Sequence, residues 1–95
     1  MTAYILVDVE VTNAEAYEQY KLLAPPAIAR YGGRYLARGG KAVVLEGDAQ
    51  PHRVVVLEFP SLEVAQAFYD SPEYRAAREV REGGCNMKMI AVEGI

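Results

Sequence analysis

The sequence contains only one cysteine, Cys85, and only one histidine, His52. A lone cysteine excludes an intrachain disulfide and any metal site built from several cysteines. The sequence also lacks a cluster of metal-ligand residues, a nucleophile elbow and a phosphate-binding glycine loop. We therefore expect no cofactor. We interpret Cys85 as an unreactive thiol in the turn Gly83–Asn86, rather than a redox-active or nucleophilic one, because no neighbouring histidine would activate it.

The sequence has little excess of either charge and no long apolar run. Its 95 residues carry a formal net charge of -3, with acidic and basic residues interspersed. We expect no nucleic-acid partner, because phosphate backbones select basic surfaces. No apolar stretch approaches the ~20 residues that span a bilayer, and no signal-peptide pattern precedes the first one. We therefore expect no membrane partner and a cytoplasmic location.

Strand and helix patterns alternate along the chain. Residues 3–11 are dense in β-branched and aromatic residues, which predicts a first strand. Thr12 and Glu15 have the spacing of a capping box, and apolar residues then recur at helical spacing. A helix is expected to begin at Thr12, with a kink or restart at Pro25 and Pro26, because proline inside a helix removes a backbone hydrogen bond.

Glycine pairs, prolines and capping serines divide the rest of the chain into further elements. The order β-α-β-β-α-β is typical of the split βαβ, ferredoxin-like fold. We therefore predict one α+β domain over residues 1–95, with an antiparallel sheet and a second helix broken in two. The expected elements are a strand at 34–38 that bends at Gly39 and Gly40 and resumes at 41–46, a hairpin partner strand at 53–59, helices capped by Ser61 and Ser71, and a strand at 87–93.

The strand at 53–59 indicates that both faces of the sheet must be covered. Val54 and Val56 lie on one of its faces, and Val55, Leu57 and Phe59 lie on the other. The helices of a ferredoxin-like domain cover only one face. A second apolar face in water requires a partner, and a second copy related by a two-fold axis is the simplest one. We expect a homodimer that forms through the sheet face.

Several stretches of the sequence resemble one family. They are Tyr31 to Gly40 (YGGRYLARGG), Arg53 to Ser61 (RVVVLEFPS), Ser71 to Tyr74 (SPEY) and Val92 to Gly94 (VEG). Together they resemble the DUF1330 family of bacterial proteins, over nearly the whole chain. The resemblance implies a dimeric α+β barrel, in which two ferredoxin-like sheets face each other. It implies no particular reaction, because the wider superfamily includes monooxygenases, isomerases, haem enzymes and ligand-binding proteins.

Tyrosines and an arginine form one candidate ligand pocket. Tyr35, Arg38, Tyr69 and Tyr74 are expected near the open end of the sheet, where Arg38 would pair with an anion. The tyrosines would supply ring surface and hydroxyl groups. The alternative is that these tyrosines only fill the periphery of the core.

His52 and Asp8 are further candidates. His52 is suited to acid–base catalysis near neutral pH, and a solvated loop residue is the alternative. Asp8 is either a buried base of the pocket or a charge at the sheet edge. Glu58 is expected to form a structural salt bridge with Arg34 or Arg38.

Two functions fit these residues. The first is a cofactor-free enzyme of monooxygenase or isomerase type, in which Arg38 or His52 polarises a small aromatic or carboxylate-bearing substrate. The second is a non-catalytic ligand-binding or stress-related accessory protein. RNA binding on the sheet is excluded, because the strand at 53–59 is aliphatic where RNA-recognition domains need aromatic residues.

Overall fold

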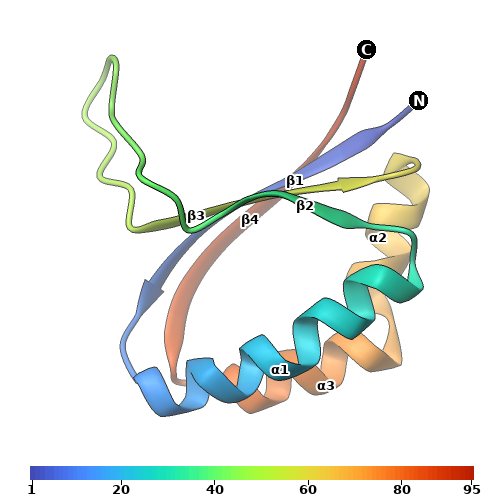
Figure 1. Ribbon diagram of the computed structural model, residues 1–95, viewed down its shortest axis with the longest axis horizontal. Helices are drawn as coiled ribbons and strands as arrows, with labels where there is room; N and C mark the ends of the chain where they lie inside the picture. The colour runs from blue at the N-terminus through green and yellow to red at the C-terminus, as the bar shows by residue number, and fades with distance from the viewer.

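The computed structural model describes residues 1–95 and contains one sheet with helices on one side of it. The strands are antiparallel and lie in the order β2-β3-β1-β4. This order and the helix placement (Figure 1) confirm the predicted ferredoxin-like α+β fold. The elements are β1 (Ala3–Val11), α1 (Ala14–Arg30), β2 (Arg34–Arg38), β3 (Arg53–Phe59), α2 (Leu62–Asp70), α3 (Pro72–Arg81) and β4 (Cys85–Glu93).

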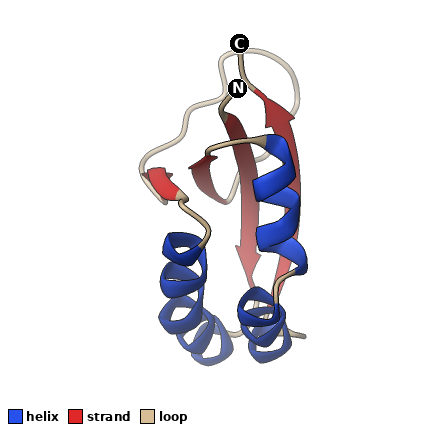
Figure 2. Ribbon diagram, turned by 90° about the vertical axis from the view of Figure 1, so that its right-hand side faces the viewer, coloured by secondary structure: helices blue, strands red, loops and turns tan.

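The helices α1 and α3 lie side by side against one end of the sheet, and the two chain ends meet at the other end (Figure 2). The ends are joined by the pairing of β1 with β4 and by a hydrogen bond from the Gly94 amide to the Thr2 carbonyl, 2.7 Å long. No helix has the length and apolar character needed to cross a membrane.

Phe68 is the centre of the hydrophobic core. Its side chain is fully buried, and its ring lies 4.8 Å from that of Phe59 and 4.5 Å from that of Tyr74. The helix-facing residues of β1, which alternate with exposed or half-buried ones, pack on the same side of the sheet. This aromatic cluster joins α2, α3 and β3, so it holds the broken second helix against the sheet.

The two predicted serine caps are confirmed. The Ser61 hydroxyl accepts a hydrogen bond from the Val64 amide at 3.1 Å. The buried Ser71 hydroxyl accepts one from the Tyr74 amide at 3.1 Å and donates one to the Phe68 carbonyl at 2.7 Å. Ser71 therefore ends α2 and begins α3 with a single side chain, which explains the break between these helices.

The predicted cap at Thr12 is wrong by one residue. Asn13 is the N-cap of α1, and its side-chain oxygen accepts a hydrogen bond from the Ala16 amide at 3.2 Å. The backbone amides of Thr12 and Asn13 both donate to the Gly84 carbonyl, at 3.0 and 2.9 Å. These bonds tie the chain to the start of β4, so the helix begins only after Asn13.

Of the kink or restart expected at Pro25 and Pro26, the restart is wrong, because α1 is continuous across both residues. Ala24, Ala27 and Ile28 on either side of the prolines are buried in the core. Helix stability in proteins comes mostly from packing of the apolar face, and here that packing outweighs the two missing backbone donors.

Residues 39–52, which we call the β2–β3 arm, are not a strand, so the strand expected at 41–46 is wrong. Gly39 has a positive φ of 72° and turns the chain out of the sheet. Beyond it no strand is available for pairing, and the arm projects away from the helices (Figure 1). Leu45 at its tip is 95% exposed.

The last strand begins at Cys85, two residues earlier than expected. Cys85 pairs with Val11 of β1 and is half-buried. The prediction that it lies in a turn is therefore wrong, because β1 extends far enough to pair with it.

The sheet face without helices is apolar at its centre, as the sequence predicted. Leu6 of β1 lies between Val56 of β3 and Ile90 of β4 on this face. Leu6 is 39% exposed and Ile90 is 62% exposed. Contiguous exposed apolar side chains of this kind mark an interaction surface.

Replacement of Phe68 by alanine tests the centre of the core. We expect the Phe68→Ala variant to lose about 3–5 kcal/mol of unfolding free energy, because a buried phenylalanine leaves a cavity when truncated. Urea denaturation measures this loss. Val80→Ala on the exposed side of α3 is the control and is expected to change stability by less than about 0.5 kcal/mol. A loss of similar size in both variants would contradict this account of the core.

Candidate functional site

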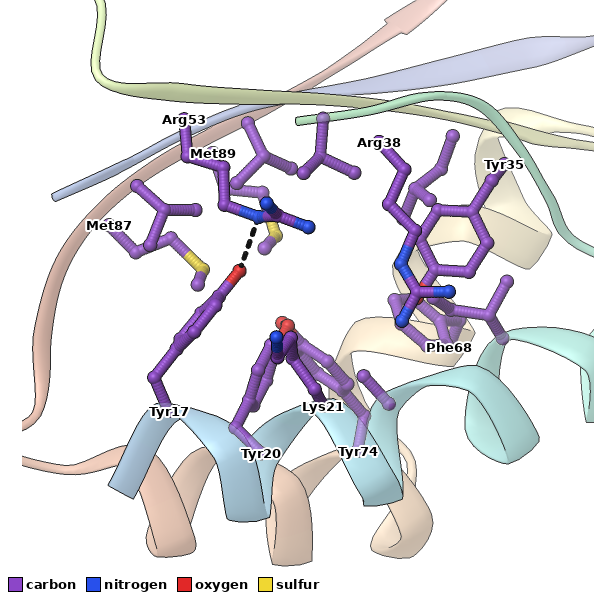
Figure 3. Close-up of a pocket in the computed structure, with 16 residues that line it drawn as sticks. Tyr17, Tyr20, Lys21, Tyr35, Arg38, Arg53, Phe68, Tyr74, Met87 and Met89 are labelled. Carbon is purple, nitrogen blue, oxygen red and sulfur yellow. Dashed lines mark hydrogen bonds between the residues drawn. The ribbon is translucent and has the colours of Figure 1, made fainter. Parts of the chain in front are cut away.

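A cavity lies between the sheet and the helices α1 and α3, and it is the candidate site (Figure 3). Its volume is about 30 Å³, which is room for roughly two water molecules. Most of its lining is hydrophobic. The polar lining residues are four tyrosines and three cations: Tyr17, Tyr20, Tyr35, Tyr74, Lys21, Arg38 and Arg53.

The helices supply hydroxyl groups to the cavity. Tyr17 and Tyr20 come from α1 and Tyr74 from α3, and all point from the helices towards the sheet (Figure 3). The hydroxyl groups of Tyr20 and Tyr74 lie 2.6 Å apart, which is a short hydrogen bond. Burial raises the pKa of Tyr20 and of Tyr74 above the ordinary value for tyrosine. Both hydroxyl groups are therefore protonated at neutral pH; one donates to the other, and the proton of the second stays available to a further acceptor.

The sheet supplies two arginines to the same cavity. Arg53 of β3 donates from Nε to the Tyr17 hydroxyl at 3.1 Å (Figure 3). Arg38 of β2 places its guanidinium carbon 4.5 Å from the centre of the Tyr35 ring, and burial raises the pKa of Tyr35. Both arginines lie on the helix-facing side of the sheet, since Arg38 pairs with Val55 and Arg53 with Val9 in the register.

The two arginines of the cavity are not neutralised by acidic residues. No aspartate or glutamate lines it, and neither Arg38 nor Arg53 forms a salt bridge. Lys21 pairs with Glu18 along α1, with a distance of 2.8 Å between Nζ and Oε1. The site therefore presents positive charge and hydroxyl donors to a small enclosed space, which complements an anion.

The structure brings together three of the four residues of the expected ligand pocket. Tyr35, Arg38 and Tyr74 line the cavity, whereas Tyr69 lies just outside it. The Tyr69 ring packs on that of Tyr74 with 5.7 Å between the ring centres. The guanidinium group of Arg78 covers its other side at 4.2 Å. Tyr69 therefore supports the wall that carries Tyr74.

His52 and Asp8 lie together on the opposite, helix-free side of the sheet and do not reach the cavity. The backbone amide of His52 donates to Oδ1 of Asp8 at 2.8 Å. The ring Nδ1 of His52 lies 3.3 Å from Oδ2 of Asp8. Its Nε2 lies 3.5 Å from a carboxylate oxygen of Glu10. The two residues form their own polar cluster at the base of the β2–β3 arm.

Sequence reasoning missed Tyr17, Tyr20, Lys21 and Arg53 as cavity residues. Both tyrosines stand at the helical spacing that predicts the first helix, and this pattern indicates a buried side chain but no role for its hydroxyl group. One feature of the sequence could have indicated a polar site here. Arg53 alternates with Val55 and Leu57, which are buried, so it lies on the core-facing side of β3.

Of the two partners expected for Glu58, Arg34 forms the salt bridge. Its Nε lies 2.7 Å from Oε1 of Glu58. This pairing leaves Arg38 free to face the cavity.

The chain matches a known family over nearly its whole length. The match covers residues 2–95 and the family is described as a domain of unknown function, DUF1330. The chain belongs to the DUF1330 family. The resemblance seen in the sequence is thereby confirmed. No curated protein matches the sequence.

Solved structures share the fold of this DUF1330 domain. A protein of unknown function from Rhodopseudomonas palustris is 23% identical, with 99% of this chain and 82% of that chain covered and a TM-score of 0.79. A dimeric ferredoxin-like protein of unknown function from Jannaschia is 14% identical, with 99% and 100% covered and a TM-score of 0.69. SnoaB, a cofactor-independent oxygenase from Streptomyces nogalater, is 10% identical, with 99% and 93% covered and a TM-score of 0.63. At these identities the matches show the fold alone.

The residues of the DUF1330 domain offer no ready metal site. No group of three or more histidine, cysteine, aspartate or glutamate side chains is positioned to hold a metal ion. The polar cluster of His52, Asp8 and Glu10 is instead linked internally by the hydrogen bond from the His52 amide to Asp8, with ring nitrogens of His52 3.3 Å from Asp8 Oδ2 and 3.5 Å from Glu10 Oε2.

The contact between Asp8 and His52 makes the stability of the fold depend on pH in the acidic range. The backbone hydrogen bond from His52 lowers the pKa of Asp8 below its ordinary value. A lowered folded-state pKa stabilises the fold above about pH 3.9, and this contribution is lost as the pH falls through the folded-state pKa. We expect Asp8→Asn to be less stable than the parent at neutral pH, with a difference that shrinks in acid.

Chemical denaturation from about pH 2 to pH 7 measures this difference. Asp48→Asn in the exposed β2–β3 arm is the control and is expected to follow the parent at every pH. A constant difference between the parent and Asp8→Asn across the whole range would contradict the assignment.

Proposed function

We propose that the cavity of this DUF1330 domain binds a small organic anion. One observation carries the proposal: three cations and four tyrosines line the cavity and no carboxylate does. Arg38 is exposed and Arg53 is half-buried, and neither forms a salt bridge, so both guanidinium groups are available to an anion. A bound carboxylate or enolate would pair with them through charge-assisted hydrogen bonds.

The ligand class follows from the rest of the lining. Most lining residues are hydrophobic, and the rings of Phe68 and Tyr74 form part of the wall. Such a surface favours a ligand whose anionic group is joined to an apolar body, and the cavity itself has room for the anionic group. Small aromatic acids and keto acids combine both features.

We further propose that the domain is an enzyme of monooxygenase or isomerase type. Both reactions can pass through an organic anion, either a carbanion that reacts with dioxygen or an enolate that is reprotonated at another carbon. Arg38 and Arg53 would stabilise that anion electrostatically. The fold shared with SnoaB, a cofactor-independent oxygenase, is compatible with this proposal. In this proposed enzyme Arg38 polarises the substrate, as expected from the sequence. His52 takes no part in the reaction, because it lies on the other side of the sheet.

A non-catalytic binding role is the second candidate function. The protonated state of three tyrosines in the cavity favours it. Burial raises the pKa of Tyr20, Tyr35 and Tyr74, so their hydroxyl groups stay protonated. Protonated phenols hold an anion but do not remove a proton from it. Turnover of an aromatic keto acid by the parent protein would decide in favour of the enzyme.

We propose that the domain forms a homodimer through the helix-free face of its sheet. The exposed apolar centre around Leu6 and Ile90 supports this proposal. Around it lie the ion pair of Arg34 with Glu58 and the cluster of His52 with Asp8. An apolar centre with a polar rim is the usual anatomy of a protein interface. Several proteins of the same fold are described as dimeric.

Removal of one cavity arginine tests the binding proposal. We expect phenylpyruvate to bind the parent protein, and Arg38→Ala and Arg53→Ala each to weaken binding by roughly tenfold to a hundredfold, because a hydrogen bond to a charged group is lost. Isothermal titration calorimetry measures the affinity. Arg34→Ala, on the other face of the sheet, is the matched control and is expected to bind like the parent. Equal affinity in all four proteins, or no binding of aromatic acids at all, would refute the proposal.

A charge on the helix-free face tests the dimer. We expect sedimentation to show dimers of the parent at micromolar concentration. Ile90→Asp is expected to give monomers, because it places an unpaired charge at the apolar centre of the interface. Leu22→Asp, at a 68% exposed position on α1, is the control and is expected to stay dimeric. A monomeric parent would rule out the proposed interface.

A further inference from the structure

A second hollow adjoins the cavity at the side of β4. Its volume is about 400 Å³, more than ten times that of the cavity. We call it the outer hollow. It opens to the surface between β4 and the helices α2 and α3, and its lining includes Gln66, Tyr69, Arg81, Ile90 and Ala91.

Two methionines form the wall between the cavity and the outer hollow. Met87 and Met89 of β4 line both spaces. Both are half-buried, and Figure 3 shows their side chains pointing from the sheet into the cavity. Methionine side chains are unbranched and flexible, so they adapt to a ligand that passes between them. Side chains rather than backbone therefore separate the two spaces.

The sizes of the two spaces limit what each can hold. The cavity has room for roughly two water molecules, which is the size of a carboxylate group rather than of an aromatic ring. An aromatic ring or an alkyl chain fits only in the outer hollow. A ligand whose anionic group reaches Arg38 and Arg53 can therefore place its body past the methionines, in the outer hollow.

The charges of the outer hollow favour an uncharged body there. Asp70 and Arg81 are its two charged lining residues, one of each sign. The Arg81 guanidinium carbon lies 5.4 Å from the centre of the Tyr20 ring, and its Nε is buried without a hydrogen-bond partner. A guanidinium so placed can pack on an aromatic ring, while Asp70 repels a second anionic group.

We propose that the ligand is an elongated monocarboxylic acid with an apolar body. Its carboxylate lies in the cavity near Arg38 and Arg53, and its body passes between Met87 and Met89 into the outer hollow. This inference rests on the proposed binding of an organic anion and adds the length of the ligand and its path. Met87 and Met89 then determine specificity for chain length.

A series of phenyl-substituted acids tests the path. Benzoate, 3-phenylpropanoate and 5-phenylpentanoate share a carboxylate and differ in the distance from it to the ring. We expect calorimetry to show at least tenfold tighter binding of 5-phenylpentanoate than of benzoate to the parent protein. Met87→Trp, which fills the passage, is expected to abolish this gain. Met87→Leu conserves the volume and is the matched control, expected to keep the gain.

The outcomes separate this inference from the proposed function. If benzoate binds and affinity does not rise with length, or the gain persists in Met87→Trp, the path is wrong and anion binding stands. If no acid of the series binds, or Arg38→Ala binds them all like the parent, both proposals fail. Thermal unfolding checks that Met87→Trp is folded. Should it be unfolded, Met89→Ala decides: a wider passage is expected to admit 4-phenylbenzoate at least tenfold more tightly than the parent does, and equal affinity overturns the path.

Discussion

Two arginines on the helix-facing side of the sheet constrain the rest of the structure. Arg38 and Arg53 occupy positions where aliphatic side chains would ordinarily pack against a helix. Each arginine contacts a tyrosine: the half-buried Arg53 donates to the Tyr17 hydroxyl, and the exposed Arg38 lies over the Tyr35 ring. Long polar side chains on both layers keep α1 from closing onto β2 and β3, and a small cavity remains. Phe68 forms part of the cavity wall, and behind it the rings of Phe59 and Phe68 pack with 4.8 Å between their centres.

The two faces of the sheet therefore have different roles. The helix-facing side holds the cavity, the arginines and the tyrosine hydroxyl groups. The other side combines an apolar centre with a polar rim, to which His52 and Asp8 belong. The two sides are physically coupled through β1 and β3, because neighbouring residues of a strand point to opposite faces. Arg53 faces the cavity while Val54, the next residue, faces the proposed partner.

The sequence predicted the elements whose signals are local. The bounds of β1, β2 and β3 and the serine caps at Ser61 and Ser71 follow from strand composition and capping chemistry within a few residues. The errors come from contacts between segments far apart in the sequence. The Gly84 carbonyl moves the cap of α1, and residues 41–46 have strand composition but no strand to pair with. For the site, Tyr35, Arg38 and Tyr74 were found by residue type. Which side of the sheet His52 occupies depends on the path of the arm, which no local signal encodes.

The protonation of the cavity limits the chemistry that it can perform. Lysine and arginine only donate hydrogen bonds, and the phenols of Tyr20, Tyr35 and Tyr74 are held in their protonated form by burial. Such a set of donors stabilises an anion strongly but offers no strong base. A substrate that reacts here must therefore enter as an anion or lose its proton easily, as an acidic enol or phenol does beside a guanidinium group. The same reasoning explains why a neutral analogue would gain little from the site: it would offer no charge to pair with Arg38 and Arg53.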